Sequence, residues 1–189
     1  RDRTRSVGRV VRDVEVRILD GEGQELPVGE TGEIFLRSSG LFSGYYNDSA
    51  KTEAAYHGDW FTLGDMGRVD EDGYLYLVDR RDDMVISGGE NIYPSEVEDV
   101  LLRHPAVSDV AVIGVPDPNW GETLKAVVRV RDGVSVTPEE LTAFCADHLA
   151  DYLKPRSYDF VDALPRNPTG KILKRELREK YWQASEAKV

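Results

Sequence analysis

The sequence contains a single cysteine and only three histidines among its 189 residues. One thiol cannot form a disulfide within the chain, which excludes a disulfide scaffold and favours a reducing compartment such as the cytoplasm. Cys145 shares a predicted helix face with Leu141 and Leu149, so we expect it to pack in a core and not to act in catalysis. Thiols and imidazoles this scarce and scattered supply neither a metal-ligand cluster nor a Ser-His-Asp or Cys-His catalytic set.

Long apolar runs and an excess of positive charge are also missing. No segment approaches the roughly 18 apolar residues that a membrane-spanning helix needs. The formal net charge of −11 argues against nucleic acid as a general partner. The charge is uneven, because residues 13–99 carry 21 acidic and 6 basic side chains and residues 154–180 carry 8 basic and 4 acidic ones. The basic stretch fits a small phosphorylated ligand, although a solvated helix face also explains it.

The chain up to Asp79 is expected to consist mainly of strands. By alternation and composition, the strands are residues 14–18, 33–37 and 74–78. A helix is expected over residues 49–56, with Asp48 as its cap. Gly64-Asp65 predicts a turn at a strand end, and residues 70–73 predict a hairpin turn.

After residue 82 the pattern changes to mixed α and β. The expected helices are residues 95–103, 137–149 and 172–182, and the expected strands are residues 107–115, 124–130 and 158–161. Ser95 with Glu98, and Thr137 with Glu140, have the spacing of capping boxes. The sequence therefore predicts an α+β fold in which a β-rich part is followed by a smaller α+β part.

Residues 79–98 lie between these two parts and combine several signals. Charged residues crowd around Asp82, an apolar run follows, and Gly88 and Gly89 then interrupt it before a helix begins. Such a joint suggests two bodies that can move, and a surface turn between two strands is the simpler alternative.

Residues 79–98 resemble the hinge and following loop of the adenylate-forming acyl-CoA ligases, the AMP-binding synthetases that include luciferase and nonribosomal-peptide adenylation domains. Residues 60–65, ending in Gly64-Asp65, resemble the nucleotide motif of the family, and residues 165–172, with Gly170-Lys171, resemble its terminal motif. The resemblance implies that residues 1–81 are the β-rich end of a large N-terminal domain. Residues 82–189 would then be a mobile C-terminal lid domain that pivots at Asp82.

The resemblance also implies a nucleotide site. The carboxylate of Asp65 would accept the two ribose hydroxyls of AMP, Arg80 would also reach the nucleotide, and Leu77 would lie beside it. The family usually has Thr directly before this Gly-Asp pair, whereas here Leu63 stands there and Thr62 lies one residue earlier.

For CoA, the resemblance assigns the thin pantetheine arm to the loop of Ser87, Gly88 and Gly89, where glycines let a ligand approach the backbone. A plain turn with positive φ is the alternative. The CoA nucleotide would be held by two aromatic and two basic residues, namely Trp120, Tyr152, Lys154 and Arg156.

Lys171 is the predicted catalytic residue. The resemblance directs its ammonium to the negative charge that develops between the carboxylate of the acid and the α-phosphate. An ordinary surface lysine is the simpler interpretation of the sequence alone.

We therefore expect the C-terminal part of a ligase that activates a fatty or aromatic carboxylic acid with ATP and transfers it to CoA. The chain begins at Arg1 without an initiator Met, so we take it for a piece of a longer protein that does not adenylate alone. The phosphate-binding loop, the acid pocket and the glutamate that holds Mg²⁺ are expected upstream, with no metal ligands in this chain. Two alternatives stay open: an adenylation domain that loads a carrier protein, and a non-catalytic nucleotide-binding module.

Overall fold

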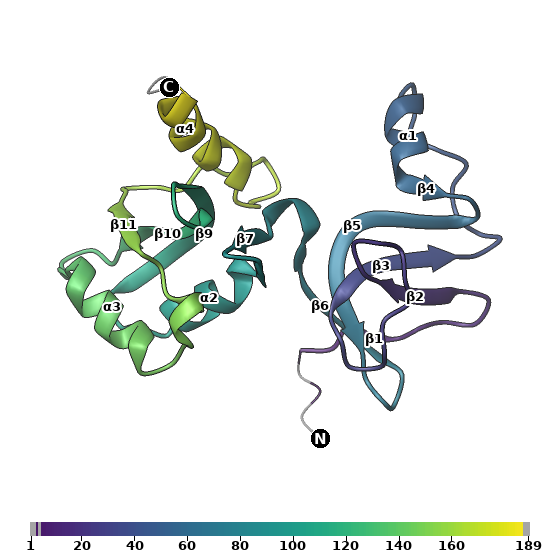
Figure 1. The fold of residues 1–189 in the computed structure, drawn as a ribbon, viewed down its shortest axis with the longest axis horizontal. Helices are drawn as coiled ribbons and strands as arrows, with labels where there is room; N and C mark the ends of the chain where they lie inside the picture. The colour runs from purple at the N-terminus through teal and green to yellow at the C-terminus, as the bar shows by residue number, and fades with distance from the viewer. Residues whose placement is uncertain (1–2, 4, 187–189) are drawn as a thin grey trace. The chain divides into compact units, whose positions relative to one another are not determined.

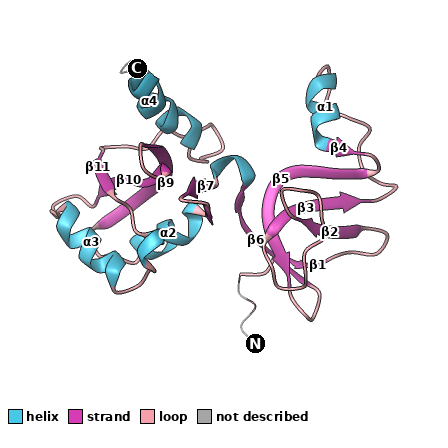
Figure 2. Cartoon of the chain, in the orientation of Figure 1, coloured by secondary structure: helices cyan, strands magenta, loops and turns pink. Residues whose placement is uncertain are grey.

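The structure is a computed structural model that describes Arg3 and residues 5–186. The chain divides into two compact units, residues 1–82 and 83–189 (Figures 1 and 2). Both units contain helices and strands, so the predicted α+β class is confirmed. Their identification as the end of a large domain and a lid stays a prediction.

The described part of the first unit is built on one antiparallel sheet of six strands. They are β1 (Gly8–Arg9), β2 (Glu15–Leu19), β3 (Gly32–Arg37), β4 (Tyr56–His57), β5 (Trp60–Val69) and β6 (Tyr74–Arg80). Their order is β1-β6-β5-β3-β2, with β4 beside β5. Ile34, Phe35, Phe61 and Met66 are among the buried residues of this sheet, so β3 and β5 form its centre.

Two local predictions for this unit are confirmed. Helix α1 (Ser49–Ala55) begins after Asp48, whose side chain accepts the N–H of Lys51 at 3.0 Å. The β5–β6 hairpin turns at residues 70–73, where Oδ1 of Asp70 accepts the N–H of Tyr74 at 2.9 Å. This bond is the main reason why the pKa of Asp70 lies below its ordinary value.

The predicted turn at Gly64-Asp65 is wrong, because both residues lie inside strand β5. They belong to a bulge in which residues 63–65 face Ile34 alone on β3. Gly64 has a φ of +73°, which residues with a side chain rarely adopt. A glycine at a bulge gives the same sequence signal as a glycine at a turn, and only the pairing with β3 distinguishes them.

The second unit holds a mixed sheet between helices. Its strands are β7 (Val85–Ser87), β8 (Glu90–Ile92), β9 (Val107–Asp117), β10 (Gly121–Val130) and β11 (Ser157–Phe160). Its helices are α2 (Pro94–Leu101), α3 (Pro138–Ala146) and α4 (Lys174–Glu186), with short 3-10 helices η1 (Arg81–Asp83) before it and η2 (Asp151–Leu153) within it. Strand β10 pairs in parallel with β11 and antiparallel with β7 and β9.

Alternate residues of β9 contribute to two cores on opposite faces of this sheet. Val110 and Val112 pack in the cluster that includes residues of α2 and α3, whereas Ala111 and Ile113 pack in the cluster reached by α4. Cys145 lies fully buried in the first cluster, as expected, and burial raises the pKa of its thiol. No helix within the described residues is long and apolar enough to cross a membrane.

One of the two predicted capping boxes is confirmed. At the start of α3, the hydroxyl of Thr137 accepts the N–H of Glu140 at 3.2 Å, and the Glu140 carboxylate accepts the N–H of Thr137 at 2.8 Å. The box at Ser95 and Glu98 is wrong, because Pro94 starts α2 and Tyr93 is the N-cap. Glu98 instead accepts the N–H of Val112 at 2.7 Å.

Candidate functional site

Strands β5 and β6 bring two of the predicted nucleotide residues together. Asp65 and Arg80 are cross-strand neighbours, with Nε of Arg80 3.2 Å from Oδ1 of Asp65. The side chain of Asp65 is 28% exposed and that of Arg80 is 49% exposed. A carboxylate and a guanidinium that are paired yet open to solvent can bind a ligand with hydroxyl and phosphate groups.

Leu77 lies on the same strand, β6, three residues before Arg80. It pairs in register with Gly67 of β5 and is 51% exposed. An apolar side chain is therefore open to solvent on β6.

A second group of polar side chains lies around the bulge of β5, and the sequence did not predict it. The hydroxyl of Thr62 donates to Oε1 of Glu33 at 2.7 Å and accepts the N–H of Gly64 at 2.9 Å. Nη1 of Arg81 lies 3.1 Å from each carboxylate oxygen of Glu33. The partners are 29 and 48 residues apart in the sequence, so no local pattern indicates their contact.

Asp82, the predicted hinge residue, is the last residue of the first unit and lies in η1. Its side chain is 82% exposed, and its Oδ1 is 3.7 Å from Nε of Arg81.

The paired glycines form the turn of the β7–β8 hairpin, in which Ser87 pairs with Glu90. Gly88 and Gly89 have φ values of +60° and +90°, as the two central residues of a type I′ turn require. A Cβ atom at Gly88 would lie 2.7 Å from the ring of Trp120, whereas at Gly89 it would meet nothing within 4 Å. Gly88 is therefore needed for contact with the indole, while Gly89 faces open space.

Trp120 links this hairpin to one of the predicted cations. Its carbonyl accepts the N–H of Gly88 at 3.0 Å, and the guanidinium carbon of Arg156 lies 5.4 Å from its ring centroid. Trp120 is 47% exposed, which leaves part of its ring open for stacking. The structure thus groups Ser87, Gly88, Trp120 and Arg156.

The other two predicted CoA residues are not joined to this group in the described part of the chain. Tyr152 is exposed on η2, and Lys154 forms an ion pair with Asp151. Beside the hairpin, Glu122 accepts a hydrogen bond from the backbone of Ile86, and burial still raises the pKa of its carboxyl.

Most cations of the basic stretch 154–180 form ion pairs with carboxylates of the second unit. The ion pairs are Lys154–Asp151, Arg166–Asp109, Lys174–Glu98, Arg175–Glu179 and Arg178–Asp83. The stretch is therefore not an open phosphate-binding patch, since internal carboxylates offset most of its charge.

Lys171 differs from these cations. Its backbone is fixed, because Oδ1 of Asn167 accepts its N–H at 2.8 Å and its carbonyl accepts the N–H of Asn167 at 2.9 Å. Its side chain is exposed, and within the described residues it has no recorded ion pair or ring contact. A loop with a fixed backbone thus presents an exposed ammonium that has no ion pair among the described residues.

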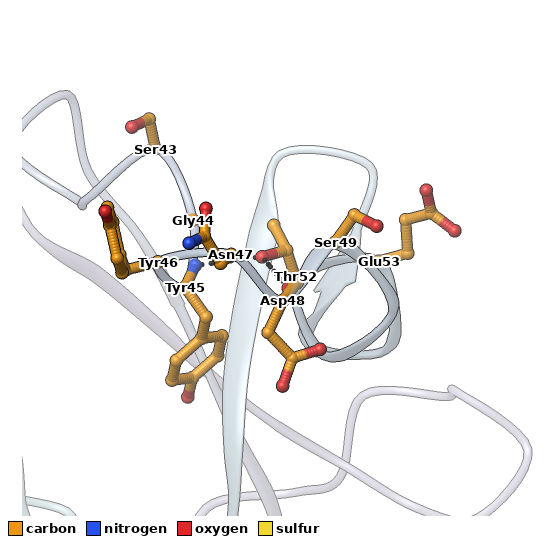
Figure 3. A pocket seen from close by; sticks show the side chains of 9 residues that line it. All are labelled: Ser43, Gly44, Tyr45, Tyr46, Asn47, Asp48, Ser49, Thr52 and Glu53. Carbon is orange, nitrogen blue, oxygen red and sulfur yellow. Dashed lines mark hydrogen bonds between the residues drawn. The ribbon is translucent and has the colours of Figure 1, made fainter.

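A hollow in the surface of the first unit lies elsewhere, around the start of α1 (Figure 3). The hydroxyl of Thr52 shapes its wall by accepting the N–H of Tyr45 at 2.9 Å and donating to the carbonyl of Asp48 at 2.9 Å. None of the predicted site residues lines this hollow. Among the described residues, no three carboxylate, imidazole or thiol side chains are grouped so that they could hold a metal ion.

Comparison with protein-family models gives two matches. Residues 1–46 match the model described as AMP-binding enzyme, and residues 96–171 match the model described as AMP-binding enzyme C-terminal domain. The second match includes Trp120, Tyr152, Lys154, Arg156 and Lys171.

Curated relatives and solved structures that resemble the chain are ligases and synthetases by name. The chain is 41% identical over 97% of its length to the fatty acid–[acyl-carrier-protein] ligase ScoC of Streptomyces coeruleorubidus, covering 36% of that protein. It is 45% identical over 93% of its length to the long-chain-fatty-acid–CoA ligase FadD13 of Mycobacterium tuberculosis, covering 35%. The o-succinylbenzoate CoA synthetase MenE of Bacillus subtilis, solved with its acyl-adenylate intermediate, superimposes with a TM-score of 0.85 at 39% identity, over 92% of this chain and 35% of that one. The chain thus spans about a third of the length of the relatives that it matches.

Proposed function

The chain belongs to the AMP-binding enzymes, and from this we propose that it forms the C-terminal part of a ligase that joins a carboxylic acid to CoA. In the first step, a carboxylate oxygen of the acid attacks the α-phosphorus of ATP, and pyrophosphate leaves. In the second step, the thiol of CoA attacks the carbonyl carbon of the acyl-AMP, AMP leaves, and the thiol loses its proton. The names of the relatives support a fatty or aromatic acid as the substrate.

The observation that carries the proposal is the open Asp65–Arg80 pair on adjacent strands. The Asp65 carboxylate can accept both ribose hydroxyls of the nucleotide, for which it would exchange its contact with Arg80. Arg80, released in this way, can bind an oxygen of the nucleotide, and the exposed Leu77 can pack beside it. A structural relative solved with an acyl-adenylate supports a nucleotide ligand of this kind.

Lys171 is the proposed catalytic cation. A free ammonium on a stiff loop can be brought to the α-phosphate with little loss of backbone freedom, and it stabilises charge that grows as the oxygen attacks. Residues 82–189 would deliver it as a lid that pivots at Asp82.

The CoA site is proposed around the β7–β8 hairpin. The backbone of Ser87, Gly88 and Gly89 can border the pantetheine arm, since Gly89 faces open space. The adenine can stack on Trp120, and Arg156 can bind a phosphate near it. Roles for Tyr152 and Lys154, the upstream Mg²⁺ ligands and the cytoplasmic location stay predictions, and no step above depends on them.

A carrier protein is the second candidate acceptor, because one relative is named as an acyl-carrier-protein ligase. Both candidates share the adenylation step and differ only in the thiol that attacks the acyl-AMP. Adding CoA or a carrier protein to preformed acyl-AMP and full-length enzyme will distinguish them. If the thioester forms only on the carrier protein, the carrier protein and not CoA is the acceptor.

The main test is pyrophosphate release by the full-length protein against a panel of fatty and aromatic acids. We expect release with at least one acid, and loss of it in the variant Asp65→Ala. Nucleotide binding without pyrophosphate release for any acid would favour a non-catalytic binding module instead.

A further inference from the structure

We propose that Thr62, Glu33 and Arg81 are positioning residues that hold the Asp65 carboxylate in place for the nucleotide, an inference that rests on the proposed function. Thr62 lies on β5, Glu33 on β3, and Arg81 directly after β6. They surround the bulge that presents Asp65, and none of them is among the predicted nucleotide contacts.

The hydroxyl of Thr62 donates its single hydrogen within the unit. Its O–H donates to Glu33 and its oxygen accepts the N–H of Gly64, and the residue is only 5% exposed. A hydroxyl has one hydrogen to donate, so Thr62 cannot give it to a ligand without leaving Glu33. Thr62 therefore does not replace a threonine directly before the Gly64-Asp65 pair, and its hydroxyl is a structural part of the bulge.

The bulge makes this hydroxyl necessary. Residues 63–65 face Ile34 alone, so the regular ladder with β3 does not supply acceptors for all their N–H groups. The oxygen of Thr62 accepts the N–H of Gly64, the residue directly before Asp65. This bond fixes the backbone next to the carboxylate that is proposed to bind the ribose.

Glu33 connects the bulge to the neighbouring strand. Its side chain is only 12% exposed, and the Thr62 hydroxyl and the Arg81 guanidinium together compensate its charge. Arg81 directly follows Arg80, the partner of Asp65. One carboxylate with little exposure thus contacts both the residue before the bulge and the residue after Arg80, which limits the movement of the Asp65–Arg80 pair.

Two variants of Thr62 test the inference in the full-length enzyme. Thr62→Val keeps the shape of the side chain and removes the hydroxyl, and Thr62→Ser keeps the hydroxyl. Because the nucleotide is bound in the ground state and the transition state alike, we expect Thr62→Val to raise KM for ATP in pyrophosphate exchange about tenfold, with kcat changed less than about twofold. Thr62→Ser should stay within about twofold of the parent enzyme in both constants. Glu33→Gln should raise KM as well, because a neutral amide binds Arg81 less strongly than a carboxylate.

Asp65→Asn, measured in parallel, separates this inference from the proposed function. If Asp65→Asn leaves KM for ATP unchanged, the nucleotide role of Asp65 is wrong and the inference falls with it. If Asp65→Asn raises KM and Thr62→Val does not, only the inference is overturned. If Thr62→Val lowers the melting temperature and leaves KM for ATP unchanged, Thr62 contributes to folding and not to nucleotide binding, and the inference is again overturned.

Discussion

The basic residues of the stretch 154–180 differ in how their side chains are held. Lys174 and Arg178 form ion pairs that join α4 to the rest of the second unit. Lys171 has a fixed backbone and an exposed side chain without an ion pair among the described residues. We therefore propose Lys171 for its fixed loop and its exposed ammonium, and not for its charge alone.

Lys171→Ala in the full-length enzyme should lower the rate of adenylation by at least about a hundredfold, because a cation directed at developing charge is lost. Thioester formation from preformed acyl-AMP should barely change. Lys171→Arg should restore little, because a planar guanidinium does not replace a compact ammonium. The matched control is Arg175→Ala, which removes an 85% exposed cation of α4 and should leave both steps unchanged. Equal losses in both steps would contradict a role confined to adenylation.

Gly88 and Gly89 are neighbours with different constraints. At Gly88 a side chain would collide with Trp120, whereas at Gly89 a Cβ atom would meet no described residue within 4 Å and only the positive φ disfavours a side chain.

Gly89→Leu should therefore slow thioester formation while adenylation stays near normal, since the new side chain would occupy the proposed path of pantetheine. Gly133→Leu is the matched control, because Gly133 also has a positive φ, +76°, and open space around it, yet lies outside the proposed site. Both substitutions carry a backbone strain of about 1–3 kcal/mol. If the two variants use CoA equally well, the path lies elsewhere.

At the scale of elements, helix α4 is held by ion pairs that are well shielded from water. Lys174 and Glu98 lie 2.8 Å apart with side chains 11% and 17% exposed, and Glu98 also binds the backbone of Val112 in β9. Glu98 thereby joins α2, α4 and the central sheet.

Removing Lys174 takes the cation away from a carboxylate that is only 17% exposed. Lys174→Met should therefore lower the free energy of unfolding by about 3 kcal/mol, measured by urea denaturation with circular dichroism. Arg175→Ala, which breaks the exposed pair with Glu179, should change it by less than about 0.5 kcal/mol. Similar losses in the two variants would mean that shielding does not set the strength of these pairs.

The same elements show where sequence reasoning succeeds and fails. The caps at Asp48 and Thr137 were predictable because donor and acceptor are three residues apart. The capping box of Glu98 was wrong because its partners lie on β9 and α4, at a distance in sequence that no local spacing encodes. The turn predicted at Gly64 was wrong for the same reason, since the register of β3 against β5 decides whether a bulge forms there.

At the scale of the whole molecule, the chain consists of two units that meet in sequence at Asp82. Charges and a change of pattern mark the region of the joint in the sequence, and the assignment of the two parts to a large domain and a lid stays a prediction. The network of Thr62, Glu33 and Arg81 was not predictable, because it depends on three segments folding together.

If residues 82–189 act as a lid, restricting φ at Asp82 should trap one arrangement of the full-length enzyme. Asp82→Pro should then impair one half-reaction far more than the other, when adenylation and thioester formation are assayed separately. Asp82→Ala, which keeps the freedom of φ, is the control and should impair neither by more than about threefold. Equal impairment of both steps by proline, with folding intact, would leave the joint without a role in domain movement.

The contact between Trp120 and Arg156 has an optical consequence. A tryptophan whose ring is half open, with a guanidinium beside it, changes its fluorescence when another aromatic group stacks on it. Trp60, in the other unit, has the guanidinium carbons of Arg17 and Arg37 at 4.5 and 4.6 Å from its ring centroid and can serve as an internal reference. If the adenine of CoA stacks on Trp120 as proposed, the emission of the unlabelled protein will change on titration with CoA, and Trp120→Phe will identify the part of the change that belongs to this ring.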